Sequence, residues 1–257
     1  MDLKRPFHHL KRAVRYLVRP ANLLYLGISV LAINLLIFYG YKDNDDLTIR
    51  ILLAQTGSDL PPPNFALWIG YLVVQYLCLC KLFDGMARLA DGRDNEPVPF
   101  APVTVTTAWL PCKYNIGLLL LGLALLPVAL PFIYSKYPLA REIAEYLLTF
   151  AIWLFAAAAL MNLIGENSIF SMINPGDWIA TIRRTGIGNY ALIILVQAAL
   201  FFAADFLLQN TVPHMAPRVA IIFTNLVNAA SFSLVFLYPA CYIPPRQTED
   251  TITRQAA

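Results

Sequence analysis

Six long runs of apolar residues divide the chain, and shorter polar stretches separate them. The runs cover residues 22–41, 64–83, 116–134, 143–165, 190–208 and 219–243. An α-helix rises about 1.5 Å per residue, so about 20 residues cross a hydrocarbon layer about 30 Å thick. None of the runs alternates apolar and polar residues, as the strands of a membrane barrel do. The pattern therefore predicts an all-α, polytopic membrane protein, in which residues 1–257 form a single domain with six transmembrane helices.

Three shorter segments have one apolar and one polar face at helical spacing. They cover residues 1–20, 82–91 and 174–186, and the third is expected to begin at an N-cap, Asn174, and to end at Gly186. Anionic lipid headgroups attract Lys and Arg by about 1 kcal/mol each. We therefore expect amphipathic helices in the plane of the inner leaflet. Their candidate lipid- or partner-contacting residues are Lys11, Arg12, Arg15, Arg88, Arg93, Trp178, Arg183 and Arg184.

The basic residues are distributed unequally between the two sides of this predicted bundle. Fourteen of the 19 Lys and Arg lie in the N-terminal segment, the second and fourth connections and the C-terminal tail. Loops rich in Lys and Arg stay in the cytoplasm, so both termini are expected there. The first apolar run is as long as a membrane span, which predicts an uncleaved first helix rather than a signal peptide. The formal net charge of +3 follows from this topology and does not indicate nucleic-acid binding.

Composition agrees with a membrane location and gives little indication of chemistry. Hydrophobic residues make up 58% of the chain and charged residues 14%, against roughly 45–50% and about 25% in soluble domains. The four cysteines lie at the expected cytoplasmic ends of spans, where thiols stay reduced, and their spacing does not favour a metal site. The sequence contains no phosphate-binding lysine loop, no G-x-S-x-G turn and no H-E-x-x-H pair. We therefore expect no cofactor, no metal and no enzymatic activity.

Two stretches resemble a group of bacterial multi-pass proteins related to the membrane domain of some glycerophosphoryl diester phosphodiesterases. They are "LFDGMARLADGRDNEPVPFAP" (82–102) and "INPGDWIATIRRTGIGNYALIIL" (173–195), and the resemblance covers about half of the chain. It implies a helical fold of about six spans with in-plane helices in a bacterial inner membrane. The group has no assigned activity that the resemblance could carry over, and the catalytic barrel of the phosphodiesterases is not part of this sequence.

Polar residues inside the apolar runs are the remaining candidates for function, because polar groups are costly in lipid. They are Asn34, Gln75, Asp205, Asn225 and Asn228. Amides in spans usually form hydrogen bonds between helices, and the alternative is that they line a polar path. Asp205 either reaches the outer interface or pairs with Arg218, or it forms a proton or cation site.

Three hypotheses about function follow. The first is a non-catalytic accessory or scaffold subunit that packs against a larger membrane complex and inner-leaflet lipids. The alternative is a small transporter or channel that uses Asp205 and the span amides, and a cavity shared by these residues would favour it. The third is a lipid-modifying enzyme with polar residues at the cytoplasmic interface, namely Asp84, Arg88, Asp91, Arg93, Arg183 and Arg184.

Overall fold

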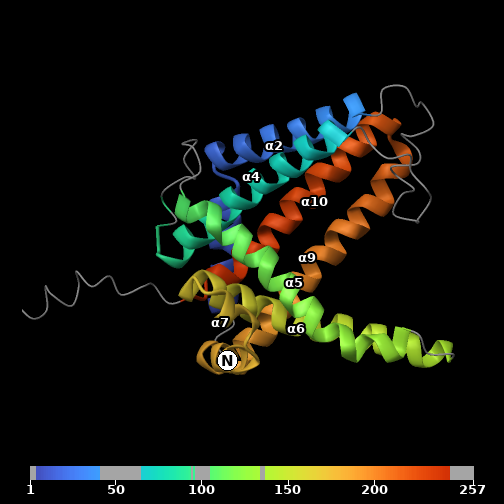
Figure 1. Ribbon diagram of the computed structural model, residues 1–257. Helices are drawn as coiled ribbons and strands as arrows, with labels where there is room; N and C mark the ends of the chain where they lie inside the picture. Colours follow the sequence, from blue (N-terminus) through green and yellow to red (C-terminus); the bar gives the residue numbers. More distant parts are fainter. Residues whose placement is uncertain (1–3, 41–64, 94, 96–104, 134–136, 244–257) are drawn as a thin grey trace, which may run out of the picture.

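A computed structural model describes residues 4–40, 65–93, 95, 105–133 and 137–243 of the chain (Figure 1). These residues form helices and no strands, so the predicted all-α class is confirmed for them. The elements are α1 (Lys4–Leu17), α2 (Pro20–Gly40), α4 (Phe65–Ala90), α5 (Val105–Ile133), α6 (Pro138–Glu166), α7 (Ile169–Ile173), α8 (Pro175–Thr185), α9 (Ile187–Thr211), the 3₁₀ turn η2 (Val212–His214) and α10 (Pro217–Ala240). The ends of some predicted spans, residues 41, 64 and 134, lie outside the described residues.

The long helices coincide with the predicted apolar runs, but fewer of them qualify as membrane spans. Within the described residues, Ile187–His214 and Arg218–Ala240 are long and apolar enough to cross a membrane. A third span is possible if Pro6–Leu17 and Pro20–Leu35, which are bent by 66° at their junction, count as one. Length and composition thus give two or three candidate spans in the described part of the chain. The predicted number of six spans is not confirmed.

The bundle is closely packed at one end and open at the other. Helices α2, α4, α10 and α9 run side by side, whereas the α5–α6 hairpin leaves the bundle in a different direction (Figure 1). We call the packed end, where Phe83, Leu163 and Tyr238 are buried, the closed end. At the opposite, open end, large apolar side chains of α6 and α9 are exposed, among them Phe150, Phe202 and Phe206. The core therefore holds the helices together mainly at the closed end.

Glycine allows a close helix contact in this core. A Cβ atom built on Gly117 of α5 would lie 2.5 Å from Sδ of Met172 in α7. That is inside van der Waals contact, so a side chain at residue 117 would require the buried thioether of Met172 to move. Met172 is 2% exposed, which shows that this contact belongs to the core.

Helix α8 begins and ends as the sequence predicts. The backbone N–H of Gly176 donates to Oδ1 of Asn174 at 3.0 Å, which caps the helix. Gly186 has a φ of +87°, a conformation that L side chains rarely adopt, and it separates α8 from α9. Both boundaries are thus confirmed.

Two predictions near the closed end are corrected. The expected separate amphipathic helix at 82–91 is the continuation of α4, which runs unbroken from Phe65 to Ala90. Its apolar face, with Phe83, Met86 and Leu89, is fully buried in the core instead of facing the membrane. Trp178, expected to contact lipid or a partner, is only 7% exposed. Local periodicity identified these apolar faces but could not show whether protein or lipid covers them.

Candidate functional site

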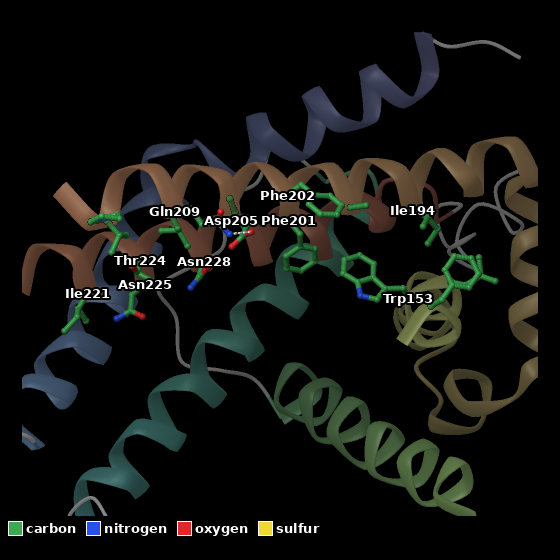
Figure 2. A pocket seen from close by; sticks show the side chains of 17 residues that line it. Trp153, Ile194, Phe201, Phe202, Asp205, Gln209, Ile221, Thr224, Asn225 and Asn228 are labelled. Atoms are coloured by element: carbon green, nitrogen blue, oxygen red, sulfur yellow. Dashed lines mark hydrogen bonds between the residues drawn. The ribbon is translucent and has the colours of Figure 1, made fainter. Parts of the chain in front are cut away.

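A cavity of about 910 Å³ lies between α6, α9 and α10. We call it the aromatic cavity. Figure 2 shows its polar side chains grouped in one part and Phe201 and Trp153 in another. The lining residues are Phe150, Trp153, Leu154, Ile194, Ala198, Phe201, Phe202, Ala204, Asp205, Leu208, Gln209, Val212, Pro213, Ile221, Thr224, Asn225 and Asn228.

Asp205, Asn225 and Asn228, three of the candidates within the predicted spans, share this cavity. Asp205 accepts a hydrogen bond from Nε2 of Gln209 at 2.8 Å. The described residues show no ion pair between Asp205 and Arg218, so this alternative for Asp205 is not observed among them. The carboxylate therefore faces the cavity with an amide as its neighbour and without a cationic partner in the described part of the chain.

The amides of this cavity differ in how they are bonded. Nδ2 of Asn225 donates to Oδ1 of Asn34 at 2.9 Å, which links α10 to α2. Asn34 is 1% exposed, and this contact confirms the interpretation of span amides as interhelical hydrogen bonds for this pair. Asn228 is exposed and has no hydrogen-bond partner among the described residues. The hydroxyl of Thr224 is buried and likewise unpartnered within the described chain. Donors and acceptors therefore remain available at this cavity.

Aromatic rings form the other part of the cavity wall. The rings of Trp153 and Phe201 meet edge to face, with centroids 5.0 Å apart and an interplanar angle of 79°. Phe150 and Phe202 add two further rings. Aromatic faces attract cations as well as apolar groups, and the attraction grows when water is excluded. A carboxylate beside such a wall suits a positively charged, amphipathic molecule.

Sequence inspection did not identify this aromatic wall. Phe201 and Asp205 are one helical turn apart, so their spacing places them on one face of α9. That spacing is the local signal that could have connected them. Trp153 is contributed by α6, and only the tertiary structure brings it to the same place.

A second cavity of about 550 Å³ lies between α2, α4 and α10, and we call it the α2–α4 cavity. It includes Gln75, the remaining candidate from the predicted spans, and Lys81. Phe201 and Asn228 line both cavities. The two cavities therefore meet at these side chains.

The basic candidate residues separate into exposed and internally bonded groups. Lys11 and Arg15 of α1 and Arg183 and Arg184 of α8 are exposed. By contrast, a guanidinium nitrogen of Arg12 donates to the carbonyl of Leu89 at 3.0 Å, which joins α1 to α4. The four exposed residues can contact a membrane surface as they stand, whereas Arg12 could do so only if its hydrogen bond to Leu89 were broken.

Two further basic candidates pair with carboxylates of their own segment. Nε of Arg88 lies 3.1 Å from Asp84, and both side chains are largely buried. Arg93 contacts Asp91 at 2.8 Å. These four residues, named for a lipid-modifying site, thus include two local ion pairs.

Trp178 has a structural contact in place of the expected lipid contact. Its indole Nε1 donates to the carbonyl of Met172 at 2.6 Å, and its ring stacks on Phe155 with centroids 5.2 Å apart. Thr181, also buried on α8, donates to Oδ1 of Asn162 on α6. These contacts fix α8 against α6 and α7.

The cysteines are free thiols in the described structure, and no group of three or more potential metal ligands occurs within its described residues. Comparison of the chain with models of protein families, with curated proteins and with solved structures finds no match. The resemblance noted from residues 82–102 and 173–195 therefore stays a prediction.

Proposed function

We propose that the protein is a small transporter in a bacterial inner membrane and that its substrate is an amphipathic cation held in the aromatic cavity. The observation that carries this proposal is the convergence of Asp205, Asn225 and Asn228 on one cavity with aromatic walls. Such polar residues within a span are expected where a solute passes. The carboxylate balances the charge of the cation, and the rings cover its apolar part.

The proposed topology has six spans, formed by α2, α4, α5, α6, α9 and α10, with both termini in the cytoplasm. The bend of 66° between the residues of α1 and α2 supports a course of α1 along the membrane surface. The exposed Lys11, Arg15, Arg183 and Arg184 support an inner leaflet with anionic lipids at the closed end. In this orientation the core closes the cytoplasmic end, and the aromatic cavity is accessible from the outer half of the membrane.

The test is uptake of radiolabelled benzyltrimethylammonium into vesicles of phosphatidylcholine that contain the purified full chain. We expect uptake above that of protein-free vesicles and a loss of at least about tenfold in the initial rate for Asp205→Asn. A tenfold change corresponds to about 1.4 kcal/mol, well below the interaction of two charges at 4 Å near a protein surface, about 4 kcal/mol.

Glu142→Gln is the matched control, because Glu142 is exposed on α6 and does not line the cavity. This variant should transport as the unchanged protein does. Benzenesulfonate, an anion of similar shape, should neither be taken up nor compete. Equal rates for Asp205→Asn and the unchanged protein, or uptake that never exceeds that of empty vesicles, would contradict the proposal.

The accessory-subunit hypothesis is the second candidate, and the exposed apolar surface of the α5–α6 hairpin favours it. Leu119, Leu123 and Phe150 have exposed fractions of 63%, 55% and 63%, and this hairpin diverges from α9 and α10 (Figure 1). A larger membrane complex would cover this surface. The test is purification from native membranes in mild detergent: a stoichiometric partner would support the hypothesis, and a chain that migrates alone would contradict it.

A further inference from the structure

The two cavities follow one another along α10. Ile221 and Asn228 of this helix line the aromatic cavity, and Asn228 and Leu237 line the α2–α4 cavity. From Ile221 to Leu237 the helix rises about 24 Å, which is most of a hydrocarbon layer about 30 Å thick. In the proposed topology the cavities therefore form a row that extends over most of the membrane.

The far end of the α2–α4 cavity lies at the closed end of the bundle. Gly85 and Leu237 line it there, and they lie within two residues of the buried Phe83 and Tyr238 along the chain. A Cβ atom built on Gly85 of α4 would lie 3.5 Å from Cδ2 of Leu237, so α4 and α10 are in contact at this end. The distribution of Lys and Arg predicts that this end faces the cytoplasm. The row thus leads from the outer half of the membrane toward its inner surface.

Phe201 and Asn228 stand where the cavities meet, because both side chains line both cavities (Figure 2). The ring of Phe201 is 37% exposed and meets Trp153 on one side, edge to face. Asn228 is exposed, and it has no hydrogen bond to any of the described residues. Exposed side chains change rotamer within nanoseconds. Both side chains can therefore turn aside without disturbing the buried core.

The α2–α4 cavity offers a cation weaker attraction than the aromatic cavity does. Its described lining includes the hydroxyl of Ser29 and the rings of Tyr25 and Phe232, but no Asp or Glu, and Lys81, which also lines it, does not attract a cation. Aromatic faces and hydroxyl oxygens attract a cation less strongly than a carboxylate does. A solute crosses a membrane protein only if it is bound weakly enough to leave. A cation that leaves Asp205 is therefore not trapped in the α2–α4 cavity.

We propose that the α2–α4 cavity is the inner section of the transport path and that Phe201 is the gate between this section and the aromatic cavity. The cation moves from Asp205 past Phe201 and Asn228 toward the closed end. This inference rests on the proposed function, because it assigns a route to the same substrate. It also makes Cys78, a half-buried residue that lines the α2–α4 cavity, accessible to a cation from the outer side.

The thiol of Cys78 is the reporter in the experiment. Right-side-out membrane vesicles contain the full chain with Cys78 as its single cysteine, and 2-(trimethylammonium)ethyl methanethiosulfonate is added outside. This membrane-impermeant cation converts a thiol into a mixed disulfide and releases methanesulfinate. Mass spectrometry of the purified chain measures the labelled fraction over time. We expect Cys78 to be labelled, and benzyltrimethylammonium to slow the labelling by competition.

Substitutions at the gate should change this rate in opposite directions. Phe201→Trp enlarges the ring and should slow the labelling of Cys78 at least about fivefold, the effect of about 1 kcal/mol added to the barrier. Phe201→Ala should accelerate it. Leu195→Trp is the matched control, because Leu195 is 63% exposed on the same helix and lines neither cavity. A chain with Cys112 as its single cysteine should stay unlabelled, since Cys112 is also half-buried but lines neither cavity.

A thiol in the aromatic cavity separates this inference from the proposed function. Ala204 lines only the aromatic cavity. In a cysteine-free chain, Ala204→Cys should be labelled from outside, Asp205→Asn should slow this labelling at least about tenfold, and Phe201→Trp should not slow it. If Ala204→Cys behaves in this way but Cys78 is not labelled, the inference is overturned and the proposed function stands. If Asp205→Asn leaves the labelling of Ala204→Cys unchanged, the proposed function is contradicted and the inference falls with it.

Two further results would overturn the inference alone. Equal labelling of Cys78 in the Phe201 variants and in the unchanged protein would show that the reagent reaches this thiol by a route that bypasses Phe201. Labelling of Cys112 as fast as that of Cys78 would show that the reagent crosses the membrane outside the two cavities.

Discussion

The hydrogen bond between Asn34 and Asn225 can be tested for its contribution to stability. Asn34 is 1% exposed and uses its amide twice: Nδ2 donates to the carbonyl of Val30 at 2.7 Å, and Oδ1 accepts from Asn225 at 2.9 Å. Asn225→Leu leaves that buried oxygen without a partner in the described structure. A buried acceptor left in this way costs about 1–3 kcal/mol. We therefore expect Asn225→Leu to lower the free energy of unfolding by an amount in this range.

A double-mutant cycle isolates the pair. Asn34→Leu removes the acceptor oxygen, so no buried oxygen is left without a donor when Asn225 is also replaced. The double variant should therefore lose less stability than the two single variants lose together. Interhelical hydrogen bonds in membrane proteins contribute about 0.6 kcal/mol on average and at most about 1.7 kcal/mol. The coupling energy should lie between these values. It can be measured by tryptophan fluorescence during unfolding in mixed micelles of increasing dodecyl sulfate content.

Gln197→Leu provides the control cycle with Asn34→Leu. Gln197 donates to the carbonyl of Val235 at 2.9 Å and does not contact Asn34, so its effect should be additive. The reasoning would be refuted if the cycle of Asn34 and Asn225 were also additive within about 0.3–0.5 kcal/mol. In that case the two amides would not stabilise the contact between α2 and α10.

Three further predictions concern the packing at the closed end and the orientation of the chain. Trp178→Phe removes the 2.6 Å hydrogen bond to Met172, and the same unfolding assay should show a loss of about 1–3 kcal/mol. Gly117→Ala places a methyl group 2.5 Å from Sδ of Met172 and should cost about 1–3 kcal/mol, part of which Met172→Ala should restore. In a cysteine-free variant, a membrane-impermeant maleimide should label Asn210→Cys in intact cells, whereas Asn95→Cys should react only after permeabilisation; the reverse pattern would contradict the proposed topology.

Sequence periodicity located the helices well because their apolar runs are long. The runs at 190–208 and 219–243 correspond to α9 and α10, which are also the two candidate spans of the described structure. The local signals at α8 were equally reliable, since a cap such as Asn174 and a stop such as Gly186 act within a few residues. These features depend on neighbours along the chain, and a sequence contains that information directly.

The environment of each apolar face was less predictable. The face of 82–91 has the periodicity of a membrane-surface helix, yet α4 continues through it and buries Phe83 and Met86. Trp178 likewise has the side chain of an interfacial residue, but it stacks on Phe155 and donates to Met172. Lipid and protein interiors are both apolar, so the same pattern fits either, and only tertiary packing decides between them.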